Sequence, residues 1–496
     1  MVLLATLSIN VETTVVNVGL PTLNQALASS TRGLQWIVDS YNLAFAALVL
    51  AGGTIGDRYG RRGTLVLGLT AFAAGSVAAG LCSTTGQLVV ARVFMGAASA
   101  FIYPTTLAII TNVFPERRKR AGAIGAWGAV SGLGVAIGPI LGGVLLQTFW
   151  WGSLFLALAP SAIIAAIGAW LVVPVSRDVH RAPLDRAGLL ASIAALGILV
   201  YTIIQAPTLG WMSPWTVAGF GLAAAALAAF ITVERRQTHP LIDVTLFANP
   251  RFSAASGAVT VAFFALFGFI FLITQFFQQL QNLSPLITGV RILPVAISIA
   301  VGSAVGTRLG VARIGTKAVV TAGLVMLAMA FAWTSTVQPS VPYVIVAAQM
   351  VLLGGGLGLA TAPATDSIMA VVRPEQAGAG SAVNDATRQI GGTLGVAVLG
   401  SIFSTLYTAR LHETSVLQAL PQEARAFAGE GLAQGLAVAG QAPAALRSTM
   451  HTAVEKGFLD GLHVGCLTAA AACLLAALAV AVFLPAHPRS TTGADR

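Results

Sequence analysis

The sequence predicts an all-α membrane protein: two bundles of six transmembrane helices with two extra helices between them, fourteen in total. Composition supports this class, because 56% of the 496 residues are hydrophobic and only 9% are charged, whereas soluble domains carry about 25% charged residues. Spacing supports it too, because the apolar residues form runs of about twenty, the length that crosses a bilayer as a helix. The net charge of +10 is spread over the connections between these runs, which indicates membrane orientation rather than a nucleic-acid-binding face.

Fourteen apolar runs, separated by polar turns, set the expected spans in order. They lie at about 1–22, 35–55, 64–82, 87–110, 121–146, 152–174, 187–206, 215–233, 252–277, 286–308, 317–334, 342–370, 384–405 and 457–485. The first begins at Met1 without a polar flank, so we expect residues to precede it in the full protein. No basic region or cleavage site comes before it, so no signal peptide is expected.

The basic residues set the expected orientation of these spans, since short cytoplasmic loops are enriched in Lys and Arg. Of the 27 Lys and Arg residues, 19 fall in loops that the fourteen-span arrangement assigns to the cytoplasm, and one, Arg32, falls in a short outer loop. A missed span would invert every later loop, so this asymmetry supports the count. We therefore expect a multi-pass protein of the cell (inner or plasma) membrane with both termini in the cytoplasm. The long loop 406–456 would lie outside as a mobile or partly helical spacer.

Three parts are expected along the chain: an N-terminal six-helix bundle at 1–174, two extra linker helices at 187–233, and a C-terminal six-helix bundle at 252–485. A weak internal repeat relates the two bundles, because residues 312–317 echo residues 57–62 at the equivalent turn. This repeat indicates a transporter built from two halves.

A short cationic loop between the second and third spans, GTIGDRYGRRGTL at 53–65, is the most distinctive stretch. Its arginines place it at the cytoplasmic surface, and Gly60 permits the tight turn that returns the chain. Asp57 can pair with the arginines or with a nearby helix N-terminus. Charge alone leaves two interpretations open, a positive-inside hairpin and a gate in a conformational cycle. The residues assigned to gating are Gly53, Asp57, Arg58, Gly60, Arg61 and Arg62.

An acid and a base lie inside spans of the first half, where charges are costly and often functional. Glu12 is mid-span, where a desolvated carboxyl can bind and release a proton. The alternative is a structural hydrogen bond to Thr13 or to a neighbouring helix. Arg92 lies about five residues into the fourth span, where it can pair with Glu12 or extend outward to the membrane interface. We assign proton coupling to Glu12 and Arg92.

The fifth span carries the glycine-rich stretch GVAIGPILGGVL at 134–145. Glycines every four residues form a groove in which another helix can pack closely, and the proline removes a backbone donor and kinks the helix. A grooved and kinked helix suits rocking against a partner, although close packing alone also explains it. The residues of this motif are Gly134, Gly138, Pro139, Gly142 and Gly143.

A candidate substrate cavity combines polar residues of the first two spans with an aromatic face of the ninth. Its residues are Asn17, Asp39, Phe263, Phe267, Phe271 and Gln275. Helical spacing puts the three phenylalanines on one face, which can line an apolar pocket or face lipid. Asp39 can instead lie at the membrane interface. Asp366 and Asp385 lie near the inner ends of two later spans, where we expect a structural role. Their expected partners are Arg373 and Arg388.

These motifs carry a resemblance to a known family. Residues 53–65 fit G-x-x-x-D-R-x-G-R-R-x-x-L, motif A of the major facilitator superfamily, and 134–145 fit its motif C, G-x-x-x-G-P-x-x-G-G-x-L. Residues 12–21 resemble the helix-1 element D-x-T-[IV]-V-N-V-A-L-P, with Glu for Asp and Gly for Ala. Residues 88–100 resemble motif B, which supports Arg92. Over nearly its whole length the chain resembles the fourteen-helix drug:proton antiporters of this superfamily, the EmrB/QacA type.

The resemblance implies a major facilitator fold and proton-driven export of amphipathic drugs by alternating access, without enzymatic activity. It implies no cofactor beyond the proton gradient, and we expect a monomer in the lipid bilayer that binds small molecules and protons but no nucleic acid. The P-loop pattern G-x-x-x-x-G-K-[ST] does not occur in the sequence, so ATP-driven transport is not expected. Two alternatives stay open: a dedicated proton-coupled exporter of one natural product or lipid, and a non-transporting membrane receptor or scaffold.

Overall fold

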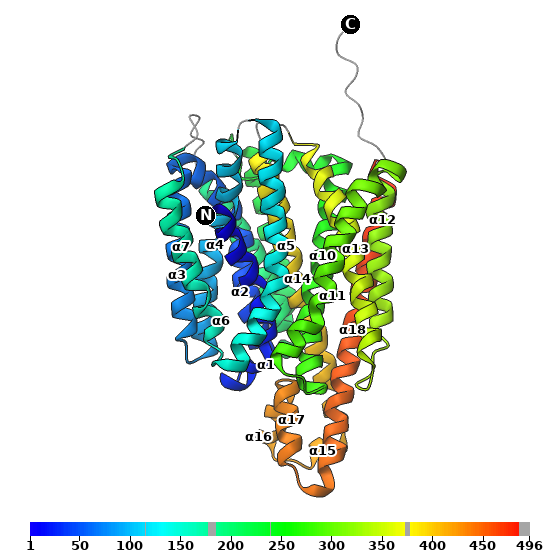
Figure 1. The fold of residues 1–496 in the computed structure, drawn as a ribbon. Coiled ribbons are helices and arrows are strands. Elements are labelled where there is room, and N and C mark those ends of the chain that lie inside the picture. The colour runs from blue at the N-terminus through cyan, green and yellow to red at the C-terminus, as the bar shows by residue number, and fades with distance from the viewer. Residues whose placement is uncertain (115, 177–184, 239, 373–376, 486–496) are drawn as a thin grey trace.

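The computed structural model describes residues 1–114, 116–176, 185–238, 240–372 and 377–485. Within these ranges the regular structure is helical, and fourteen helices are long and apolar enough to cross a membrane. The predicted all-α fold class and the number of spans are therefore confirmed. Figure 1 shows the helices side by side in one upright bundle, with a smaller group of helices projecting below it.

The N-terminal half consists of seven helical segments that make six spans. They are α1 (Val2–Ala26), α2 (Thr31–Tyr59), α3 (Arg61–Gly80), α4 (Thr85–Val113), α5 (Arg117–Thr148), α6 (Ser153–Leu156) and α7 (Leu158–Val172). Ser30 and Thr84 cap α2 and α4, because their side chains accept hydrogen bonds from backbone N–H groups of the first turn. The sixth span was expected as one helix at 152–174, but it is divided into α6 and α7 at Ala157.

The C-terminal half repeats this arrangement with six long helices. They are α10 (Pro250–Gln275), α11 (Pro285–Val305), α12 (Val311–Thr334), α13 (Tyr343–Met369), α14 (Ala377–His412) and α18 (Ala444–Phe483), with short π-helical turns η2 (Phe276–Leu280) and η3 (Gly306–Gly310). Equivalent turns of the two halves share an unusual backbone, since Gly60 has φ of 118° and Gly315 has φ of 82°. Glycine adopts such angles without a steric penalty, and the two positions fall in the repeated sequence segments.

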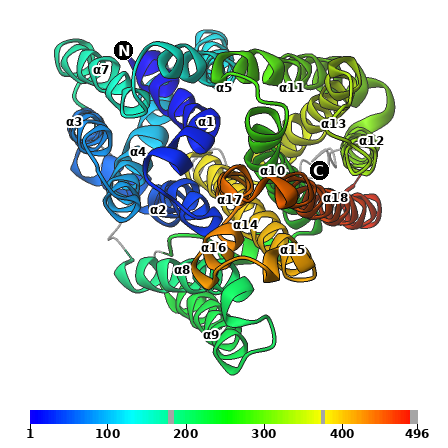
Figure 2. The same ribbon diagram turned by 90° about the horizontal axis from the view of Figure 1, so that it is seen from below.

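Two helices lie outside both halves, α8 (Arg186–Leu209) and α9 (Pro214–Arg236), and a 3-10 turn, η1 (Val244–Ala248), follows them. Helix α8 contacts α2 of the first half and α14 of the second, while α9 packs on α8. Figure 2 shows the pair at the edge of the bundle, beside the seam where α2 and α14 meet. The extra helices therefore brace one of the two seams between the halves.

The loop expected at 406–456 is largely helical. It forms three short helices, α15 (Ser415–Gln418), α16 (Gln422–Gly429) and α17 (Leu432–Gln441), which we call the cap. Helices α14 and α18 extend into the same region, so both are longer than the spans expected at 384–405 and 457–485. The hydropathy falls where these helices leave the apolar layer, but their alanine-rich sequence continues to favour helix.

The cap rests on the turn between α1 and α2. The backbone N–H of Thr31 donates to the carbonyl of Glu430 over 2.9 Å, and Gln434 Nε2 donates to the carbonyl of Ser29 over 2.8 Å. The cap therefore connects the C-terminal half to the N-terminal half at one end of the bundle, which we call the cap end. Helix α1 begins, and α18 finishes, toward the opposite end (Figure 1).

Candidate functional site

Glu12 and Arg92 form an ion pair inside the N-terminal half. Arg92 Nη1 contacts Glu12 Oε1, with 2% of the Arg92 side chain and none of the Glu12 side chain exposed. Arg92 Nε donates to the carbonyl of Ile37 over 2.8 Å, and its guanidinium lies 4.5 Å from the centre of the Tyr41 ring. The Tyr41 hydroxyl in turn donates to Ser99 Oγ over 2.9 Å. Helices α1, α2 and α4 thus meet at one charged pair. Arg92 does not extend outward to the membrane interface, and its charged partner is Glu12.

This pair is stable only while both of its members are charged. Removing one charge from a buried pair costs about 3–5 kcal/mol, because the remaining charge loses its compensation. Proton binding to Glu12 would have this effect, since it leaves Arg92 with a carbonyl and an aromatic face. The pair can therefore convert protonation into a change in how α1 packs against α2 and α4.

Asp39 is a second acid in the membrane layer. Its side chain on α2 is fully buried within the protein. Neither of its carboxylate oxygens has a hydrogen-bond partner among the residues that the structure describes. An unpaired carboxylate in such a place is far more costly than a neutral carboxyl, so Asp39 is another group that can carry a proton.

The motif glycines of α5 allow its backbone to touch α1. A Cβ on Gly134 would stand 2.7 Å from Asn10 Cβ, and one on Gly142 would stand 3.0 Å from the carbonyl oxygen of Val15. At Gly138 it would overlap the Thr14 hydroxyl. Because every position along this row lacks room for a side chain, α5 packs directly beside the segment of α1 that carries Glu12.

The same helix also meets the other half of the protein. A Cβ on Gly143 would collide with the backbone of Leu286, and one on Gly289 would collide with the carbonyl of Pro139. Helix α5 is therefore held between α1 and α11, in backbone contact with both halves. The contact between α5 and α11 is thus one of the two large contacts between the halves, the other being that between α2 and α14.

The cationic loop ties its turn to the rest of the N-terminal half. Asp57 Oδ1 accepts from Arg61 Nε over 2.8 Å, and Arg61 N donates to the carbonyl of Ser176 over 2.9 Å. Arg62 lies 4.9 Å from the ring centre of Trp170 on α7. Gly60 supplies the positive φ that this turn requires. The gating residues therefore join the C-terminal end of α2, the N-terminal end of α3 and the C-terminal end of α7.

Two further gating residues extend this contact set. Gly53 lies beside Pro104 of α4, and the guanidinium of Arg58 lies 5.5 Å from the ring centre of Tyr59. The contact of Gly53 with Pro104, together with a 3.4 Å hydrogen bond from Arg61 Nη1 to the carbonyl of Ala108, brings α4 into the same network. The loop is thus a junction of four helices.

We expect Asp57→Asn to slow transport several-fold while substrate affinity changes little. The asparagine keeps the size of the side chain but loses the charge that holds Arg61. The junction therefore weakens, while none of the candidate substrate residues takes part in its contacts. Initial rates of transport and equilibrium substrate binding would be measured on the same purified variant. A loss of affinity as large as the loss of rate would contradict a gating role.

The candidate substrate residues differ in how far they are buried. Phe271 and Gln275 are buried inside the C-terminal half, because other helices of that half pack against α10 on several sides. Phe267 is 8% exposed, and only Phe263 is half-buried, with the Arg388 guanidinium 5.4 Å from its ring centre. Asn17 is buried and donates to the carbonyl of its own helix one turn before. The expectation of a single aromatic face lining a pocket is not supported by these positions.

Asp366 and Asp385, the acids near the inner ends of two later spans, were expected to pair with Arg373 and Arg388. Arg388 Nη2 donates to Thr365 Oγ1 over 3.3 Å, and among the described residues it makes no ion pair with Asp385. Asp385 is 6% exposed on α14, which contacts α4 of the first half. Arg373, the partner expected for Asp366, lies outside the described residues.

The sequence model of the Major Facilitator Superfamily matches residues 2–396 of this chain. The chain belongs to the major facilitator superfamily. Among curated members, the multidrug resistance protein Stp of Mycobacterium tuberculosis is 35% identical over 82% of this chain and 75% of its own length. The multidrug efflux pump LfrA of Mycolicibacterium smegmatis is 32% identical over 97% of this chain and 94% of its own.

Other superfamily members extend these likenesses. The tetracenomycin C resistance and export protein of Streptomyces glaucescens is 31% identical over 95% of this chain and 88% of its own. A solved bacterial homologue of the human lysosomal transporter Spinster covers 97% of this chain and 96% of its own, with a TM-score of 0.66 and 19% identity. That likeness shows the fold alone, and it agrees with the two-half architecture described above.

Proposed function

We propose that this protein is a proton-coupled multidrug efflux transporter that exports amphipathic small molecules by alternating access. The observation that carries the proposal is the buried Glu12–Arg92 pair, set beside the helix whose glycines join both halves. The similarity to the efflux pump LfrA over nearly all of both chains supports multidrug export. Superfamily members are transporters, so we assign no enzymatic activity.

The coupling follows from the electrostatics of the pair. In the charged pair, α1 is held against α2 and α4 through Arg92 and its contact with Ile37. A proton that arrives from outside neutralises Glu12 and releases α1, and α5 transmits the movement to the other half. Arg92 then favours loss of the proton toward the cytoplasm, because it stabilises the carboxylate. Substrate and proton thereby bind in alternation, and each lowers the affinity of the other.

The orientation that suits this role places the cap outside the cell and both termini in the cytoplasm of a multi-pass cell-membrane protein. The cationic loop and its arginines then lie on the cytoplasmic side, as the positive-inside rule requires. The proton gradient is the energy source, without a cofactor, and a monomer in the bilayer is sufficient. Nucleic acid has no part in this function.

Transport into inverted membrane vesicles tests the proposal. A cationic fluorescent drug should accumulate when a pH gradient, acid inside, is imposed, and should leak out when an ionophore collapses the gradient. Vesicles containing Glu12→Gln are the matched control, since the substitution removes the titratable group alone. Accumulation that is unaffected by the gradient, or that requires ATP, would contradict proton coupling.

A second candidate function is dedicated export of one natural product. The similarity to a tetracenomycin C resistance and export protein favours it. The two functions predict different resistance profiles in a host that lacks its own pumps: broad protection against unrelated drugs for a multidrug transporter, and protection against one compound class for a dedicated exporter.

A further inference from the structure

A glutamine of α2 is inserted into α14 across the seam between the halves. Gln35 is 1% exposed, and its Nε2 lies 3.2 Å from the carbonyl oxygen of Val396 and 3.0 Å from that of Ala397. The amide crosses α14 at Gly400, where a Cβ would stand 2.6 Å from Gln35 Nε2. The glycine thus forms the notch that the glutamine fills.

The extra helix α8 completes this contact. Ser401 Oγ lies 3.4 Å from Gln35 Nε2 and donates to the carbonyl of Ile203 on α8 over 2.9 Å. Ser401 is fully buried. Three helices from three parts of the chain therefore share one buried set of hydrogen bonds, and losing one of them would leave a buried polar group without a partner.

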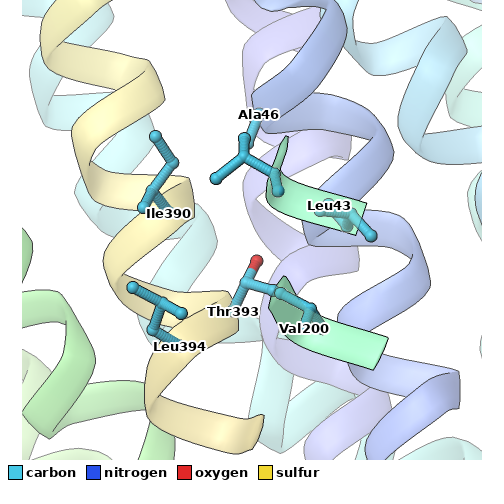
Figure 3. A pocket seen from close by; sticks show the side chains of 7 residues that line it. Leu43, Ala46, Val200, Ile390, Thr393 and Leu394 are labelled. Carbon is cyan, nitrogen blue, oxygen red and sulfur yellow. The ribbon is translucent and has the colours of Figure 1, made fainter. Parts of the chain in front are cut away.

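Apolar packing continues along the same seam. Figure 3 shows Leu43 of α2, Val200 of α8 and Leu394 of α14 facing one another across the seam, packed so closely that no space remains between them for even one water molecule. The residues around this point are apolar except for Thr393. Apolar packing holds this part of the seam, and Gln35 adds a directional hydrogen bond between α2 and α14.

The hydrogen bonds between the two halves are distributed unevenly. Among the described residues, those that join the halves lie toward the cap end. They include Gln35 on α14, Gln278 Nε2 on the carbonyl of Val18 over 2.7 Å, Gln434 on the carbonyl of Ser29, and Thr31 N on the carbonyl of Glu430. Gln278 and Gln434 bind carbonyl groups of α1 and of the turn that follows it, whereas Gln35 joins α2 to α14. The cap end is therefore closed by polar contacts, of which Gln35 makes the one between α2 and α14.

We propose that Gln35 is the gating residue of the cap end: its amide holds α2 to α14 in the closed state and has to leave the Gly400 notch before that end opens. Asp39 follows one helical turn later on the same face of α2, so withdrawal of Gln35 also opens the path by which water and protons from the cap side reach that acid. The inference extends the proposed function, because it specifies the contact that alternating access must break.

Two substitutions remove the contact from opposite sides. Gln35→Leu keeps a similar volume without a donor, and Gly400→Ala fills the notch. Loss of a buried hydrogen bond of this kind should raise the population of the cap-end-open state roughly 5- to 30-fold. Gln349→Leu is the matched control, because Gln349 is 2% exposed and its amide donates to the carbonyl of Trp333 within the C-terminal half over 3.2 Å.

The populations are measured by pulsed electron spin resonance on the full-length protein in lipid nanodiscs, without substrate. Spin labels at Ser83 and Ser340, both exposed in cap-end turns, report the separation of the halves in a background in which Cys82 is replaced by serine. The long-distance population should grow in Gln35→Leu and Gly400→Ala and stay at the wild-type level in Gln349→Leu. Where Gln35→Leu does not fold, Gln35→Asn, which is too short to reach the same carbonyls, takes its place.

Distance distributions equal to wild type in both variants would overturn the proposal, as would the same change in Gln349→Leu. The readout needs neither drug nor gradient, so it is independent of whether the protein pumps drugs. If the long-distance population grows in the two variants but the wild type shows no efflux, the proposed function is rejected and the gating role of Gln35 is supported. If the wild type shows efflux but the variants show no distance change, the proposed function is supported and the gating role is rejected.

Discussion

Replacing Glu12 by glutamine should abolish proton-driven efflux while leaving a folded protein that still binds neutral substrates. Glutamine can accept the hydrogen bond from Arg92 but cannot be charged, so the buried pair no longer alternates between a paired and an unpaired state. Arg92 keeps the carbonyl of Ile37 and the face of Tyr41, so the loss of stability should stay near the low end of the roughly 3–5 kcal/mol typical of a broken buried pair.

The measurement is the affinity for a cationic substrate as a function of pH. In the wild type, affinity should rise as pH rises, because a proton and the substrate oppose each other and the proton is lost at higher pH. In Glu12→Gln this dependence should be flat. Glu12→Asp should retain partial transport, since the acid is kept but the side chain is one methylene shorter.

Persistence of the full pH dependence in Glu12→Gln, together with continued pumping, would place the proton elsewhere. Asp39 is then the group to replace, because it is fully buried and its oxygens lack partners among the described residues. Asp39→Asn removes its charge and keeps its shape, so it serves as a parallel variant in the same titration.

Gly138→Leu should reduce transport strongly, through packing rather than chemistry. A side chain at this position would overlap Thr14 and approach the carbonyl of Val11 to 2.9 Å at its first carbon, so α5 would be forced away from α1. Overpacking of this kind costs about 1–3 kcal/mol, and each 1.4 kcal/mol is a factor of about ten. Transport should fall about 5- to 150-fold, because the displaced segment of α1 carries Glu12.

Gly132→Leu is the control for this substitution. It lies on the same helix, but a Cβ there meets no atom within 4 Å, so the added side chain should leave the transport rate close to wild type. Rates of drug efflux and the amount of folded protein in the membrane would be compared for the two variants. Equal loss in both would mean that any leucine in α5 is harmful and that the contact with α1 has no special part.

Much of the architecture follows from local properties of the sequence. The number of spans is set by runs of apolar residues and by the placement of basic loops, both of which a single sequence displays. The tight turn at Gly60 is likewise local, since only glycine adopts its φ of 118° freely. The α5 groove is visible because its glycines recur at helical spacing, although its two partners, α1 and α11, are not.

Contacts between distant segments could not be predicted in the same way. The pairing of Glu12 with Arg92 was one of two alternatives for the arginine, and nothing in the sequence pointed to Tyr41 or Ile37 as its other partners. Nothing in the sequence assigned a role to Gln35, because a single glutamine near a helix end is common. Its role depends on contact with Gly400, which is distant in the sequence. The cap was expected as a spacer, since polar composition marks the end of the membrane layer and not the end of a helix.

The burial of individual side chains was the least predictable property. Asp39 lies near the start of its span, and nothing in the sequence showed that its carboxyl is fully buried within the protein. Phe271 was placed on a cavity wall because it shares a helical face with Phe263. Other helices of the C-terminal half cover that face near the cap end of α10. Periodicity identifies which residues share a face, and tertiary packing decides what the face meets.

Proton release on substrate binding tests the central claim most directly. Purified protein in weakly buffered detergent solution would be mixed with a cationic drug while a pH indicator is followed. Proton antiport through Glu12 predicts that the wild type acidifies the solution in proportion to the drug bound, and that Glu12→Gln binds drug with little or no proton release. Binding of drug by the wild type without any release of protons would contradict the account.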